Sequence, residues 1–210
     1  MPAAGTIQTQ WGYAATVIGH YMHLIMKYFK ATKDWQFNSR ILKTDNKWLY
    51  YGEGYREATR LIEHQILEVD RSNQDFLIYP YCYLIRHYIE IRLKEIIDEG
   101  SKIINNPIDP VKVGHNLLSM WELSQEILAK IWSYESFNIP KDVFDFIHEL
   151  HLIDVKSDNF RYPIEKTGKD TLENIKEINF KILSDEFHNV RDYLDAITDI
   201  LEVMKDDNGL

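Results

Sequence analysis

One short stretch of this sequence combines residue types that could bind an anion or transfer a proton: residues 86–94, RHYIEIRLK. Arg86, Glu90 and Lys94 are successive four-residue neighbours, and with His87 they would occupy about one quadrant of a helix, at roughly 100° per residue. Such a face could bind phosphate, hold an RNA backbone or orient a general acid or base. Taken alone, the spacing favours the simpler alternative of a solvated ladder of ion pairs, each worth only about a few tenths of a kcal/mol.

Two further residues could contribute to the same chemistry. His115, in the sequence GHNLL, precedes an expected helix, where a histidine can either cap the helix or titrate near neutral pH. Arg161 has aromatic neighbours on both sides and is followed closely by Pro163, which stiffens the chain. Its guanidinium could bind an anion, or its stem could pack on the neighbouring rings.

Familiar catalytic and metal-binding motifs are missing from the sequence. It contains no glycine-rich phosphate loop, dinucleotide fingerprint, zinc-protease histidine pair or calcium loop. His20 with His23, and His148 with His151, are each three residues apart, but neither pair has a convincing third ligand. The sequence therefore predicts neither a metal site nor a cofactor, and it leaves open whether the protein is an enzyme.

The elements that must position these residues are expected to be helices, because apolar residues recur at three- and four-residue intervals and glycine and proline are sparse. Pro80 is expected in the first turn of the third helix, Gly100 at its end, and Ser184 at the cap of the last helix. A small hairpin is expected over residues 40–51, turning at Asp45 and Asn46. The six predicted helices cover residues 14–30, 55–69, 76–99, 116–133, 140–151 and those from 184 onward.

Composition favours one all-α domain, a compact helical bundle spanning residues 1–210. Of all residues, 45% are hydrophobic, which is enough for a sizeable core, and no linker or repeat suggests a second domain. The net charge of -9 disfavours loose, charge-driven attachment to nucleic acid or anionic membranes, although a local basic pocket remains compatible with it. Residues 11–26 are uncharged but too short for a membrane span. The single cysteine, Cys82, lies in an apolar run and is expected to be buried in a cytoplasmic protein.

Over about residues 76–204, the chain resembles the HEPN superfamily. The resemblance rests on three features: a helix with His and Glu followed by Lys, a helix that starts at His-Asn-Leu, and an Arg-Tyr-Pro segment before the final helix. HEPN domains are helical bundles, often dimeric, and many are ribonucleases or nucleotide-binding partners in toxin-antitoxin and phage-defence systems. The resemblance implies RNA cleavage or binding of RNA, a nucleotide or a partner protein, in a bacterial or phage setting.

The chain departs from the catalytic HEPN pattern, in which Arg is followed by His after four to six intervening residues. Arg161 and His188 match the residue types without the spacing, and in the final helix His188 precedes Arg191. The sequence is therefore at least as compatible with a noncatalytic HEPN relative as with a metal-independent ribonuclease. We expect Arg86 and Arg161 to be exposed and to bind an anionic group in one polar site with His87, Glu90 and His115.

The alternative function is a structural or accessory dimer without a nucleic-acid ligand. The resemblance and an excess of aromatic residues, including Trp121, Trp132 and Tyr193, favour a helix-mediated homodimer. The same apolar residues could instead all belong to the core.

Overall fold

A computed structural model describes residues 28–41, 46–132 and 139–208 of the chain. The chain divides into two compact units, residues 1–43 and residues 44–210. The expectation of a single domain stays a prediction.

The described part of the first unit is a short segment with one 3-10 turn, η1 (Trp35–Phe37). Asn38 closes a local loop, because its side chain accepts a hydrogen bond from the Thr32 backbone N–H at 2.9 Å and donates one to the Thr32 carbonyl at 2.8 Å. The helix expected over 14–30 lies almost entirely outside the described residues, and its three described residues, 28–30, are not helical.

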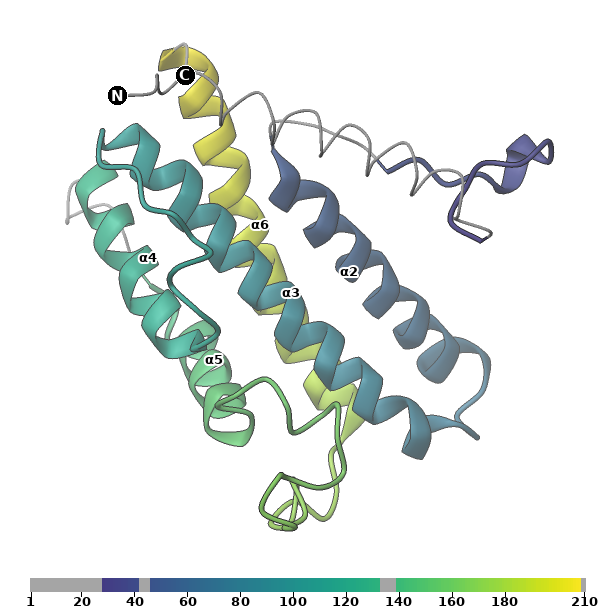
Figure 1. Cartoon of the computed structure of the whole chain (residues 1–210). Coiled ribbons are helices and arrows are strands. Elements are labelled where there is room, and N and C mark those ends of the chain that lie inside the picture. The colour runs from purple at the N-terminus through teal and green to yellow at the C-terminus, as the bar shows by residue number, and fades with distance from the viewer. Residues whose placement is uncertain (1–27, 42–45, 133–138, 209–210) are drawn as a thin grey trace, which may run out of the picture. The chain divides into compact units, whose positions relative to one another are not determined.

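The second unit confirms the all-helical class. Five α-helices are described where the sequence predicts about six, and the described residues contain no strand apart from an isolated bridge between Ile164 and Asp170. The long helix α3 contacts α2, α4 and α6, while α5 contacts α4 and α6 (Figure 1). The helices are α2 (Lys47–His64), α3 (Gln74–Ile103), α4 (Leu117–Ile131), α5 (Lys141–Ile153) and α6 (Phe180–Asn208).

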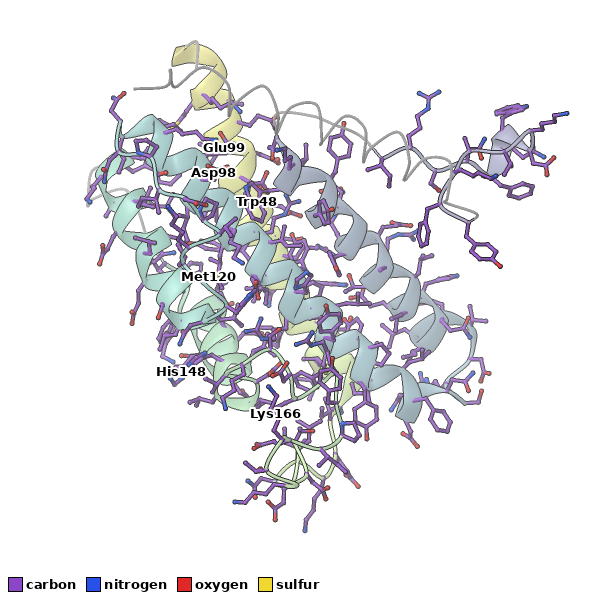
Figure 2. All side chains as sticks on the ribbon, in the orientation of Figure 1. Trp48, Asp98, Glu99, Met120, His148 and Lys166 are labelled. Atoms are coloured by element: carbon purple, nitrogen blue, oxygen red, sulfur yellow. The ribbon has the colours of Figure 1, made fainter. Side chains whose placement is uncertain are left out.

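Helix α2 shows that the expected hairpin over 40–51 is wrong. The Asn46 side chain accepts a hydrogen bond from the Leu49 backbone N–H at 3.1 Å and so caps a helix that starts at Lys47. Trp48 in the first turn donates its indole N–H to Asp98 of α3 at 3.1 Å (Figure 2). The helix therefore begins eight residues before the predicted Tyr55, because tertiary contacts stabilise its first turns, and a π-helical turn, η2 (Gln65–Val69), follows its end.

Helix α3 extends beyond both predicted ends. It begins at Gln74, so Pro80 lies in its second turn rather than its first, where it removes one backbone donor. Gly100 does not end the helix, which continues to Ile103 and stops before Asn105, a residue with a φ of 54°. Gly100 instead allows α4 to approach, since an added Cβ would lie 2.7 Å from Cγ2 of Ile127.

The last three helices begin near their expected starts, with one correction. Asn116 caps α4 by accepting a hydrogen bond from the Ser119 N–H at 2.9 Å, and Pro140 immediately precedes α5. Helix α6 starts at Phe180, and the Asn179 side chain accepts from the Ile182 N–H at 3.1 Å. Ser184 is therefore a buried residue within the helix rather than its cap.

The core lies around α3 and includes most of the large apolar residues of the five helices. Trp121 of α4 is buried and packs against Phe144 of α5 and Tyr193 of α6. Cys82 is buried as expected, and burial raises the pKa of its thiol to about 12. None of the described helices has the length and apolar character needed to cross a bilayer, whereas residues 11–26 lie outside the described part.

Gly100→Ala is predicted to lower the free energy of unfolding by about 1–2 kcal/mol. Overpacking costs about 1–3 kcal/mol, which exceeds the ~1 kcal/mol that alanine gains over glycine inside a helix. Urea denaturation measures the change, and Ile127→Leu in the same chain should restore part of it by removing the Cγ2 methyl group.

Gly54→Ala is the matched control, because nothing lies within 4 Å of an added Cβ at this exposed position of α2. It should raise the free energy of unfolding by about 0.5–1 kcal/mol. Equal effects of the two substitutions would contradict close packing at Gly100.

Candidate functional site

The row Arg86, Glu90 and Lys94 on α3 forms the expected ion pairs, but it is buried rather than solvated. The Arg86 guanidinium is 0% exposed and donates from Nη1 to Glu90 Oε2 at 2.8 Å. Lys94 Nζ donates to the other oxygen, Glu90 Oε1, at 2.9 Å. The expectation that Arg86 is an exposed arginine is therefore wrong, because neighbouring helices and loops cover this face of α3.

Two loops supply the remaining partners of this row. Arg86 Nη2 donates to the His115 carbonyl at 2.7 Å, and Arg86 Nε donates to the Asp154 carbonyl at 3.2 Å. The Asp154 carboxylate lies 3.4 Å from Arg86 Nε and accepts backbone N–H groups of Asp158 and Asn159 at 2.8 and 3.0 Å. Arg86 thus ties the ends of two connecting segments to the central helix.

Glu90 is where the charges converge. His115 Nδ1 lies 2.7 Å from Glu90 Oε1, so the loop between α3 and α4 places His115 against α3. Asn116, rather than His115, supplies the side-chain cap of α4. Burial alone would raise the pKa of Glu90, but hydrogen bonds from Lys94, His115 and Arg86 outweigh it and hold that pKa below 4.5. We call Arg86, Glu90, Lys94 and Asp154 the buried network, and the exposed His115 side chain contacts it at Glu90.

His87 lies beside the buried network but contacts aromatic rings. Its imidazole stacks on Tyr83, one turn earlier in α3, with centroids 5.6 Å apart and planes 17° apart. Tyr55 of α2 meets the same imidazole edge-on at 4.5 Å. Burial lowers the pKa of His87, and Glu90 only partly opposes that effect. His87 is therefore mainly neutral at pH 7 and can accept a proton or a hydrogen bond.

Arg161 is joined to His87 through Tyr83. The Arg161 guanidinium carbon lies 5.8 Å from the centroid of the Tyr83 ring and 5.3 Å from that of Tyr162. Its Nε donates to the Ser157 carbonyl at 2.7 Å, and its side chain pairs with Asp158 and stays 39% exposed. We call Tyr55, His87, Tyr83 and Arg161 the stacked surface.

A cavity of about 990 Å³ adjoins Arg161, between the first turns of α3 and the loop over residues 159–178. Its charged lining residues are predominantly acidic: Asp75, Asp170, Glu173 and Glu177 against Arg161 and Lys176. This balance is unfavourable for a phosphate group. The lining of this cavity therefore does not favour binding of an anion.

His188 is not brought together with the other candidates. Its Nε2 lies 3.0 Å from Glu63 Oε2 of α2, and the Tyr81 hydroxyl donates to Glu63 Oε1 at 2.6 Å. This separate cluster links α2, α3 and α6. Arg161 and His188 are thus held by different partners in the second unit.

A second charged cluster was not recognised from the sequence. Arg92 of α3 is almost fully buried and donates to Glu95 at 2.8 Å and to Glu53 of α2 at 2.7 Å. Asp195 of α6 lies 2.8 Å from Arg92 and accepts a hydrogen bond from the Tyr88 hydroxyl. The three-residue spacing of Arg92 and Glu95 was visible in the sequence. Nothing local pointed to Glu53 or Asp195.

The arrangement offers stacking, one accessible guanidinium and a neutral imidazole. In the part of the chain that the structure describes, no group of three or more His, Cys, Asp or Glu side chains could hold a metal ion. The four-residue spacing of Tyr83 and His87 was the signal that could have identified the stacked surface from sequence.

Arg86→Met is predicted to lower the free energy of unfolding by about 3–5 kcal/mol, because it leaves the buried Asp154 carboxylate without its cation and removes one of the two cations that contact buried Glu90. Thermal or urea denaturation measures the loss. Arg161→Met is the control, and its partly exposed ion pair should contribute about 1 kcal/mol or less. Equal losses in the two variants would contradict a special role for burial at Arg86.

Glu90→Gln is predicted to flatten the acid side of the pH–stability curve. The folded pKa of Glu90 lies below its unfolded value of 4.5, so its stabilisation is present above about pH 4.5 and is lost as pH falls through the folded pKa. Urea denaturation at pH 7, 5, 4 and 3 should show a less stable variant at pH 7 with a smaller loss on acidification. Parallel curves for the two proteins would refute the assignment.

No protein-family model, no curated protein and no solved structure matches the chain. The HEPN resemblance rests on the motifs at Arg86–Lys94, His115 and Arg161 alone, and it stays a prediction.

Proposed function

We propose that this protein binds RNA or a nucleotide at the stacked surface. The observation that carries the proposal is the position of the Arg161 guanidinium over the Tyr83 ring, which itself stacks on His87. A cation and aromatic faces in one place suit a ligand that has both phosphate and planar bases.

Each group has a part in this recognition. Bases of single-stranded RNA stack on aromatic side chains and on arginine planes, with about 1–3 kcal/mol per base. Arg161 remains 39% exposed and can present two donors to a phosphate. The neutral imidazole of His87 can accept a hydrogen bond from a base or a ribose hydroxyl.

The buried network has a supporting role in this proposal. Arg86 is fully buried with its donors directed to protein acceptors, so it holds the segment that leads from Asp154 to Arg161 rather than touching the ligand. His115 is different, because its side chain is 69% exposed and contacts Glu90. It can therefore take part in contacts at the edge of the site.

The biological setting is proposed from the HEPN resemblance. On that basis the protein is a HEPN-like RNA-binding protein of a bacterial or phage defence or toxin-antitoxin system. Nuclease activity is not part of the proposal, since Arg161 and His188 have separate partners.

The alternative of a structural dimer draws less support from the observed packing. Trp121, one of the aromatic residues that favoured it, is 3% exposed and packs on Tyr193 within the unit. Trp121 is therefore part of the core and is not available for a dimer interface.

Arg161→Gln and Tyr83→Leu are each predicted to weaken RNA binding about five- to tenfold, because each removes one stacking or phosphate contact. Fluorescence anisotropy with a 5′-labelled 12-nucleotide single-stranded RNA, at fixed low salt, measures the dissociation constant. Thermal melts of the same samples show whether the fold is retained.

Arg60→Gln and Tyr50→Leu are the matched controls, since both residues are exposed on α2 outside the stacked surface. They should leave the dissociation constant within about twofold of the parent. Unchanged binding in both Arg161→Gln and Tyr83→Leu would overturn the proposed function.

A further inference from the structure

Residues 28–41 expose an unusual number of large apolar side chains. Every residue of this segment except Asn38 is exposed, and we call the segment the aromatic arm. Four aromatic residues and one isoleucine in it are each between 79% and 91% exposed: Tyr28, Phe29, Trp35, Phe37 and Ile41. So dense a set of exposed rings marks an interaction surface rather than ordinary surface variation.

The charge of the aromatic arm is opposite to that of the whole chain. Lys30, Lys33 and Arg40 stand against a single acid, Asp34, which gives a net charge of 3 − 1 = +2 in a chain of -9. None of these three cations forms an ion pair with any residue that the structure describes, whereas Arg86 and Arg92 each pair with carboxylates. The cations of the arm are therefore available to an anionic partner.

The arm has a defined local structure around its central rings. Phe37 N–H donates to the Asp34 carbonyl at 3.0 Å, and Asn38 N–H donates to the Trp35 carbonyl at 3.1 Å. The two hydrogen bonds between Asn38 and Thr32 close the loop that carries this turn. Trp35 and Phe37 are consequently held on a turn, so less conformational entropy is lost when they bind a ligand.

We infer that the aromatic arm binds single-stranded nucleic acid, with Trp35 and Phe37 stacking on bases and Lys30, Lys33 and Arg40 contacting phosphates. Interleaved rings and cations are the combination that sequence-tolerant single-strand binding uses. The overall charge of -9 does not prevent it, because phosphate contacts depend on cations at the contact itself.

The observations favour a nucleic acid over a membrane surface. An interfacial membrane anchor presents one apolar face of an amphipathic helix, whereas the only helix described within the arm is the three-residue η1. The side chains of the segment project in several directions (Figure 2), which suits bases placed against individual rings. A protein partner, including a second copy of this acidic chain, is a separate outcome of the test.

The test uses the full chain and a 5′-fluorescein-labelled oligouridylate of 12 nucleotides, followed by fluorescence anisotropy. Trp35→Ala combined with Phe37→Ala should weaken binding at least tenfold, because two stacking rings are removed. Lys30→Gln combined with Lys33→Gln should reduce the slope of log K against log salt by about 1.4, roughly 0.7 for each phosphate that is no longer neutralised. Phe76→Ala, at a 75% exposed ring on α3, is the control and should change binding less than about twofold.

The inference is independent of the stacked surface, and the variants separate the two. If only the arm variants weaken oligouridylate binding, the inference stands and the proposed function at Tyr83 and Arg161 fails. If only Tyr83→Leu and Arg161→Gln weaken it, the inference is overturned.

Two further measurements test whether the aromatic arm instead contacts a second copy of the chain or a membrane. Light scattering that shows a mass of twice 25 kDa, reduced to 25 kDa by the aromatic arm variant, would make the arm a contact between copies. If Trp35→Ala combined with Phe37→Ala abolishes binding to phosphatidylglycerol vesicles and leaves oligouridylate binding unchanged, the aromatic arm is a membrane contact. Either result overturns nucleic-acid binding by the arm.

Discussion

The contact between Arg86 and Glu90 is the constraint on which much of the second unit depends. Helix α3 has neighbours along most of its length, and its central charged residues, Arg86, Glu90 and Arg92 among them, are buried. A buried guanidinium is tolerated only when carboxylates and carbonyls satisfy its donors. Arg86 meets this condition with Glu90 on its own helix and with two backbone carbonyls from distant segments.

This requirement fixes the loops as well as the helix. The carbonyls of His115 and Asp154 must stay within hydrogen-bonding distance of Arg86, which sets where α4 begins and where α5 ends. Asp154 in turn binds the backbone of the next residues, and Arg161 lies only a few residues farther along. The Arg161 side chain is in turn held by the Ser157 carbonyl and by Asp158.

Arg92 repeats the principle on another side of α3. Its partners Glu53 and Asp195 come from α2 and α6, so one guanidinium joins three helices. Burial itself lowers the pKa of Arg92, but contacts with the Tyr88 hydroxyl, Asp195 and Glu95 outweigh it and raise that pKa above its ordinary value. Gly52 packs close to the same guanidinium, where an added Cβ would lie 3.1 Å from its central carbon. The polar interior of the bundle is thus specified by charge pairing as well as by apolar packing.

The sequence by itself determined that the chain is helical, because the three- and four-residue recurrence of apolar side chains is a local property of each segment. It also placed Arg86, Glu90 and Lys94 on one helical row, which follows from helix geometry alone. The sequence predicted helix ends less well. Gly100 and Ser184 have the residue types typical of helix ends, but α3 continues beyond Gly100 and α6 begins before Ser184, because tertiary packing stabilises the additional turns.

Only the tertiary structure decided which charges are buried and which are exposed. Arg86 and Arg161 are the same residue type, and their solvent exposure depends on neighbours that are distant in sequence. Arg86 and Asp154, which form a hydrogen bond, are separated by 68 positions in the sequence, and Tyr88 and Asp195 are separated by 107. No local pattern encodes such pairs, because they form only when the helices pack around α3.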